Sequence, residues 1–89
     1  MELEDKIRKL INISKKTVIL LKRKMNATHS KKELDLLIKA VYENQSNIFI
    51  LSKIVGDLDG LKAEYRNDQL NIFFINIKES IKEAQDLLK

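Results

Sequence analysis

Apolar residues recur along the chain at alternating spacings of three and four residues, the period at which one side of an α-helix packs against another helix. The middle third shows the clearest series, which has a single polar member: Leu34, Leu37, Val41, Asn44, Ile48, Leu51, Val55 and Leu58. The first third has a similar series: Leu3, Ile7, Leu10, Ser14, Thr17 or Val18, Leu21 and Met25. The last third has another: Leu70, Phe73 or Phe74, Ile77, Ile81, Ala84 and Leu88. This pattern predicts three helices with coiled-coil-like seams.

Two short polar segments separate the three series. In the first, residues 26–30, Ser30 and Glu33 form a capping box that predicts the start of a helix. In the second, residues 57–60, Gly60 suits the left-handed conformation that follows a helix end. The chain has no proline and only two glycines, so long uninterrupted helices are permitted.

We therefore predict a single domain (1–89) that folds as an all-α antiparallel three-helix bundle, with long helices in up-down-up order. The helices are expected over about residues 3–25, 31–58 and 61–88. The third helix has an alternative start at Asn67 or Asp68, because both residues are good N-caps.

Polar residues interrupt the apolar series at Ser14 and Asn44. When the first two helices fold back on each other near residue 28, these two residues lie at about the same level. A buried hydrogen bond between them would fix the register of the hairpin at some cost in stability. The alternative is that one or both side chains point to solvent.

Each predicted helix also contains four consecutive apolar residues, at 18–21, 48–51 and 72–75. Because successive residues of a helix turn by about 100°, such a run encircles the helix, and one or two of its side chains must point away from the core. The side chains expected outside the core are Ile19, Phe49, Ile50, Ile72 and Ile75. If the last two runs lie side by side, they form an exposed apolar patch that is typical of an interface. A bundle with wide crossing angles would bury these side chains instead.

Charge is concentrated in the first helix. Residues 1–32 contain ten Lys and Arg residues against three acids, a net charge of +7, whereas residues 33–60 carry a net charge of −3. A basic helix face of this kind could contact the phosphates of a nucleic acid, although the helices are far longer than those of a helix-turn-helix unit. The residues that would make these contacts are Lys15, Lys16, Lys22 and Arg23.

Composition limits the classes of function. The chain has no cysteine, which excludes disulfides and favours a cytoplasmic location. Its longest apolar runs are four residues, far below the ~20 needed to cross a bilayer, so we expect no membrane insertion. The single histidine, His29, lies beside Ser30 in a predicted loop with no third catalytic group assigned, and there is no glycine-rich phosphate loop. We therefore predict no catalytic residue, no metal ligand and no cofactor.

A short resemblance to a known family lies in the second helix, where residues 33–38 read ELDLLI. This stretch resembles the Ser-Gln-Glu-Leu-Asp-x-Leu-Ile signature of the Spo0E-like phosphatases, small helical hairpins that act on sporulation response regulators. The resemblance implies a functional role for Asp35. Lys31 stands where the motif has its serine, and the third helix has no counterpart in the minimal hairpin of that family.

The leading interpretation is a small non-catalytic protein–protein interaction module, such as an adaptor, a chaperone-like protein or a phage or bacterial regulator. It would bind through its exposed apolar helix face, as a homodimer or with an amphipathic helix of a partner. The alternatives are a nucleic-acid-binding protein that uses the basic first helix and a response-regulator phosphatase.

Overall fold

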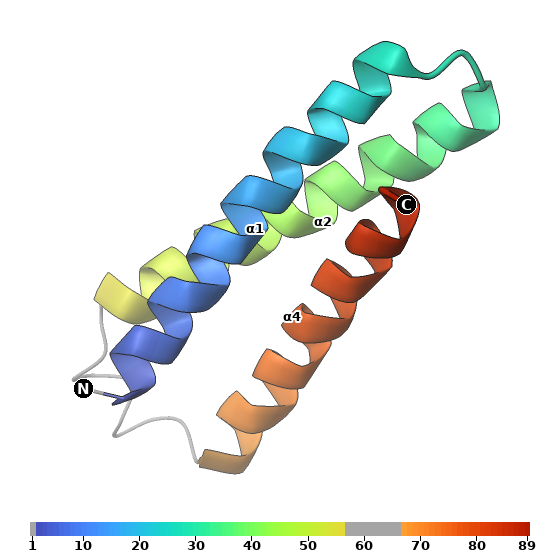
Figure 1. Cartoon of the computed structure of the whole chain (residues 1–89). Helices are drawn as coiled ribbons and strands as arrows, with labels where there is room; N and C mark the ends of the chain where they lie inside the picture. Colours follow the sequence, from blue (N-terminus) through green and yellow to red (C-terminus); the bar gives the residue numbers. More distant parts are fainter. Residues whose placement is uncertain (1, 57–66) are drawn as a thin grey trace.

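The computed structural model describes residues 2–56 and 67–89, which form three long helices packed side by side (Figure 1). The helices span Glu2–Ala27 (α1), Lys31–Gly56 (α2) and Asn67–Leu87 (α4). α2 runs antiparallel to α1, and α4 runs back along the pair. The predicted all-α three-helix bundle with up-down-up order is therefore confirmed.

The second predicted connection lies outside the described residues. Residues 57–66 include the predicted helix end at Gly60 and the earlier of the two predicted starts of the third helix. The first connection is described and occupies residues 28–30. A connection this short requires α1 and α2 to be antiparallel neighbours.

α2 begins at the predicted N-cap, Ser30. The backbone N–H of Glu33 donates to Ser30 Oγ at 3.3 Å, which satisfies one of the N–H groups that have no partner in the first turn of a helix. The N–H of Leu34 donates to the carbonyl oxygen of Ser30 at 2.9 Å and begins the helical hydrogen-bond ladder. Ser30 therefore sets where α2 starts.

Two apolar clusters form the core, and their members come mainly from the predicted seams. The Phe74 cluster consists of Ile7, Leu10, Leu51, Leu70, Phe74, Ile77 and Ile81. The Leu37 cluster consists of Val18, Leu21, Leu37, Ala40, Val41 and Ala84. Full burial of a side chain of this kind stabilises the fold by about 1.5–3 kcal/mol. Both clusters contain residues of all three helices, so α4 belongs to the same core as the α1–α2 hairpin.

A polar layer separates the two apolar clusters. Ser14 and Asn44 are 0% exposed, and Thr17 is 3% exposed. Thr17 Oγ1 donates to the carbonyl oxygen of Ile13 at 2.8 Å, and Asn44 Nδ2 donates to that of Ala40 at 2.9 Å. Ser14 Oγ and Asn44 Oδ1 have no hydrogen-bond partner among the described residues.

The burial of Ser14 and Asn44 excludes the alternative in which they point to solvent, but the hydrogen bond predicted between them is not formed. The reason is local, because the Asn44 amide turns back to a carbonyl one turn earlier in its own helix. An unsatisfied buried polar group costs about 1–3 kcal/mol. The layer therefore lowers stability, but it favours one register, since a slip of α1 along α2 would place each polar side chain against an apolar one.

α1 and α2 form the most extensive helix–helix interface, and α4 packs less extensively against both. None of the three described helices is long and apolar enough to cross a membrane.

The substitution Asn44→Leu is expected to raise the free energy of unfolding by about 1–3 kcal/mol, because it removes an unpaired buried oxygen and joins the two apolar clusters. Urea unfolding followed by circular dichroism measures this change. Gln45→Leu, at the adjacent exposed position, is the control and should change stability by no more than about 0.5 kcal/mol. Loss of stability in Asn44→Leu would show that the polar layer stabilises the fold.

Candidate functional site

The exposed apolar side chains of the described residues include all five that were expected outside the core. Their exposed fractions are 52% for Ile19, 61% for Phe49, 38% for Ile50, 60% for Ile72 and 55% for Ile75. The alternative in which wide crossing angles bury them is therefore excluded. Further exposed apolar side chains are Ile13, Leu20, Leu36 and Tyr42.

Phe49 and Ile50 face different sides of α2, because adjacent residues of a helix are about 100° apart. Ile50 follows Leu36 and Glu43 at seven-residue spacing, and both of these line a groove between α2 and α4. Phe49 lies instead within one turn of Ser52, which lines a groove between α1 and α2. The five expected residues are thus divided between two faces of the molecule and do not form one patch.

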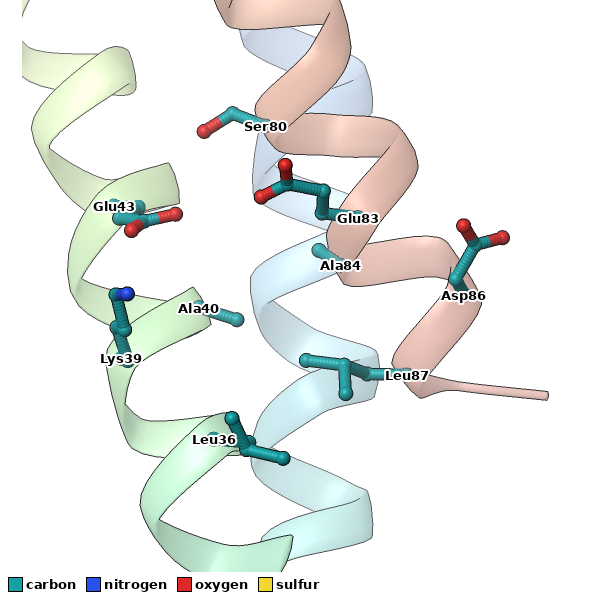
Figure 2. A pocket seen from close by; sticks show the side chains of 9 residues that line it. All are labelled: Leu36, Lys39, Ala40, Glu43, Ser80, Glu83, Ala84, Asp86 and Leu87. Atoms are coloured by element: carbon teal, nitrogen blue, oxygen red, sulfur yellow. The ribbon is translucent and has the colours of Figure 1, made fainter.

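The groove between α2 and α4 has an apolar floor and polar walls (Figure 2). Ala40 and Ala84 form its floor, and Leu36 and Leu87 stand at one end. Because alanine has the smallest apolar side chain, it leaves space between the two helices. The groove has a volume of about 280 Å³, and its lining residues are Leu36, Lys39, Ala40, Glu43, Ser80, Glu83, Ala84, Asp86 and Leu87.

Ile72 and Ile75 continue this face along α4. Each precedes a lining residue by eleven positions, Glu83 and Asp86 respectively, which is about three full turns of a helix. Since α2 and α4 run in opposite directions, Ile50 and Ile72 belong to the end of the face that is remote from the leucine pair. We call this surface the groove face. Leu36 and Leu87 form one apolar end, Ile50, Ile72 and Ile75 form the other, and Lys39, Glu43, Ser80 and Glu83 form the polar middle.

Acidic side chains dominate the middle of the groove face. Glu43 and Glu83 extend toward each other from the two sides of the groove (Figure 2), and Asp86 stands at its rim. Lys39 is the one basic residue of the lining, so the lining carries a net charge of −2. Facing carboxylates repel each other and attract a cationic group. This groove was not predicted from the sequence, because its position depends on which side of α4 faces α2. The sequence signal that points to it is the seven-residue repeat of Leu36, Glu43 and Ile50.

The predicted nucleic-acid contacts all lie on the exposed surface of α1: Lys15, Lys16, Lys22 and Arg23. Within the described ranges, none of them forms an ion pair. Lys15 lines the groove between α1 and α2, which has a volume of about 290 Å³, together with Arg8, Ile11, Asn12, Ser52 and Val55. Ile19 lies on the same side of α1, because it follows Asn12 by seven residues.

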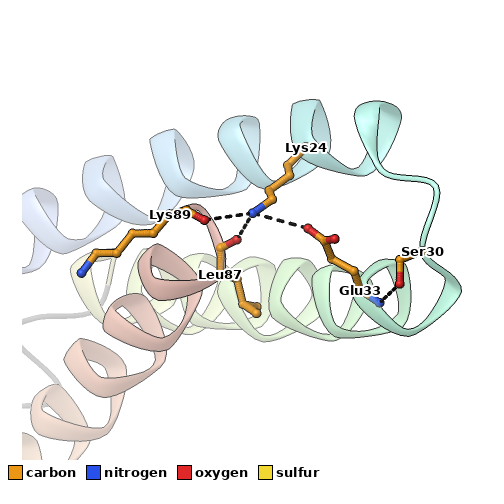
Figure 3. A network of polar contacts seen from close by, with 5 residues as sticks. All are labelled: Lys24, Ser30, Glu33, Leu87 and Lys89. Atoms are coloured by element: carbon orange, nitrogen blue, oxygen red, sulfur yellow. Dashed lines mark hydrogen bonds and ion pairs between the residues drawn. The ribbon is translucent and has the colours of Figure 1, made fainter.

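Lys24 connects the three helices at one end of the bundle (Figure 3), and sequence analysis did not identify it. Its Nζ lies 3.4 Å from the Glu33 carboxylate at the start of α2. It also donates to the carbonyl oxygen of Leu87 and, at 3.5 Å, to that of Lys89. The last carbonyl groups of a helix have no partner in their own helix and carry partial negative charge, so a lysine stabilises them. Lys24 therefore holds the C-terminal end of α4 against the α1–α2 hairpin.

The residues considered for catalysis from the sequence are all exposed. His29 and Ser30 are exposed in the α1–α2 connection, and Asp35 is exposed near the start of α2. No group of three or more His, Cys, Asp or Glu side chains within 2–56 and 67–89 could hold a metal ion. No family model matches the chain, and neither a curated protein nor a solved structure matches it.

The substitution Lys24→Met is expected to lower the free energy of unfolding by about 1 kcal/mol, because methionine keeps the apolar stem but removes the charge. Hydrogen exchange should show the largest loss of protection in the last turn of α4. Lys22→Met, which removes an exposed charge from the same helix, is the control and should leave both measurements nearly unchanged. Equal effects of the two substitutions would contradict the role of Lys24.

Proposed function

We propose that the protein is a non-catalytic interaction module that binds an amphipathic helix of a partner protein in the groove between α2 and α4. The observation that carries the proposal is the pattern of the groove face, with apolar ends and two facing glutamates in the middle. An adaptor, a chaperone-like protein or a small regulator would use such a surface in the same way.

The shape of the face suits a helix. Two antiparallel helices leave a straight groove between them, and a third helix placed over it adopts the ordinary packing of a helical bundle. Leu36 and Ile50 are 14 residues apart, which corresponds to about 21 Å along the axis. A partner helix of about 14–18 residues covers this distance and contacts both apolar ends.

The charge of the face favours a basic partner over a second copy of the chain. In a two-fold dimer that uses this face, each groove would lie against an identical groove. Glu43 and Glu83 of one copy would then approach the same acids of the other, and like charges across an interface are unfavourable. The best occupant has apolar residues toward both of its ends and Lys or Arg in between.

A single helix in this groove buries less surface than a stable protein–protein interface does, so we expect weak, transient binding with a Kd in the micromolar range. The contribution of the charged middle should decrease as salt is added, because exposed ion pairs are screened.

Synthetic helical peptides of about 21 residues test the proposal. One peptide carries leucines along one face and lysines beside its middle turn, and the other has glutamates in place of the lysines. The lysine peptide should bind at least about tenfold more tightly, as measured by fluorescence anisotropy. The double variant Glu43→Lys/Glu83→Lys should reverse this preference, whereas Asp5→Lys/Asp35→Lys, with the same change of net charge away from the groove, should not.

Sedimentation equilibrium separates this proposal from self-association. We expect the chain without peptide to be a monomer at the concentrations of the binding assay. A dimer that dissociates in Ile50→Lys/Ile72→Lys but persists in Ile19→Lys would assign the groove face to a second copy and contradict the proposal. Equal affinity for the lysine and glutamate peptides would also contradict the proposal, because Glu43 and Glu83 would then not discriminate between them.

A further inference from the structure

The basic residues of α1 repeat every seven residues on the side of the helix that does not pack into the core. They occur as pairs every seven residues: Arg8 and Lys9, Lys15 and Lys16, Lys22 and Arg23. Seven residues are close to two helical turns, so each pair stands about 10 Å further along the same side of the helix. The first member of each pair is on the side toward α2, since Arg8 and Lys15 line the groove between α1 and α2.

The facing side of α2 carries two exposed aromatic rings with the same period. Tyr42 is 70% exposed and Phe49 is 61% exposed, and they are seven residues apart. Both therefore project from one side of α2, and Phe49 lies within one turn of Ser52, which lines the α1–α2 groove. A buried position would explain large aromatic side chains through packing, but these two are mostly in contact with solvent.

The register of the hairpin brings each ring level with a basic residue. Lys24 pairs with Glu33 across the two antiparallel helices. Counting equal numbers of residues back from this pair places Lys15 level with Tyr42, and Arg8 level with Phe49. Helices in contact have axes about 8–10 Å apart, so each ring and its basic residue lie within reach of one nucleotide.

We propose that this face of the α1–α2 hairpin binds single-stranded nucleic acid. The phosphates would contact Arg8, Lys15 and Lys22, and bases would stack on Tyr42 and Phe49. Combining a track of positive charge with exposed rings is how proteins bind single strands without reading their sequence. Bases paired in a duplex are already stacked on each other and cannot stack on side chains, so the rings favour a single strand.

Two contacts already present support this assignment. Lys53 Nζ lies over the Phe49 ring, 4.5 Å from its centroid, which places a further cation beside this exposed ring, where a phosphate next to a stacked base could contact it. Arg8 pairs with Glu4 at 2.8 Å, an exposed ion pair that contributes little and that a phosphate can replace. Lys15 and Lys22 have no acidic partner among the described residues.

Fluorescence anisotropy with a labelled oligothymidine of about 15 nucleotides tests the proposal. The intact chain should bind it at about 50 mM salt, and the logarithm of the affinity should fall with the logarithm of salt concentration with a slope of about −2 to −3, as expected for three or four phosphate contacts. Tyr42→Leu and Phe49→Leu should each lower the affinity at least about fivefold. Ile72→Ala, at an equally exposed apolar position on α4, should have no effect.

The phosphate contacts and the base stacking can be measured separately. Lys15→Gln/Lys22→Gln should weaken binding and reduce the salt slope, whereas Lys78→Gln/Lys82→Gln, on exposed α4 positions, should do neither. Since the chain has no tryptophan, Phe49→Trp provides a single reporter whose fluorescence should decrease when a base stacks on it.

Several results would overturn the proposal. These are no binding at about 50 mM salt, binding that is unaffected by both leucine substitutions, or binding to anionic phosphatidylserine vesicles but not to the oligonucleotide. The double variant Glu43→Lys/Glu83→Lys keeps the residues of this face and should retain salt-dependent binding that both leucine substitutions weaken. Failure of either proposal therefore leaves the other standing.

Discussion

The register of the α1–α2 hairpin is the constraint on which the rest of the structure depends. It is set at two places. In the middle of the core, Ser14 and Asn44 form a polar layer that separates two apolar clusters. At the end, Lys24 joins Glu33 of α2 and the last carbonyl groups of α4. The polar layer lowers the stability of the fold, and the lysine raises it slightly. Both fit only one alignment of the helices, whereas a repetitive apolar seam alone would allow several.

This register determines which side chains meet on the surface. The apolar seam of α1 faces inward, so its repeated basic pairs face outward beside the exposed rings of Tyr42 and Phe49. A different side of α2, about 100° away, carries Leu36, Glu43 and Ile50, and it forms the acidic groove with α4. One small bundle thus presents two surfaces of opposite charge. They use different sides of the same helix, so a partner helix and an anionic strand could be bound without competing for one surface.

Sequence periodicity predicted the fold, the helix start at Ser30 and most of the core, because burial of a helix side follows directly from spacing. It also indicated that Phe49 and Ile72 lie outside the core. It could not place them on different faces, since that depends on which side of α4 packs against α2. Asn44 was expected to form a hydrogen bond with Ser14, but its amide donates to a carbonyl group of its own helix. Residue spacing does not determine this side-chain torsion.

The most direct test of this account is the alignment of α1 with α2 in solution. Nuclear Overhauser contacts measured on the isotope-labelled chain report which side chains are neighbours across the hairpin. The account predicts contacts between Ser14 and Asn44 and between Lys24 and Glu33. Contacts from Ser14 to Leu37 or Leu51 in place of Asn44 would show a hairpin shifted by two helical turns, and the alignment of basic residues with aromatic rings would then be wrong.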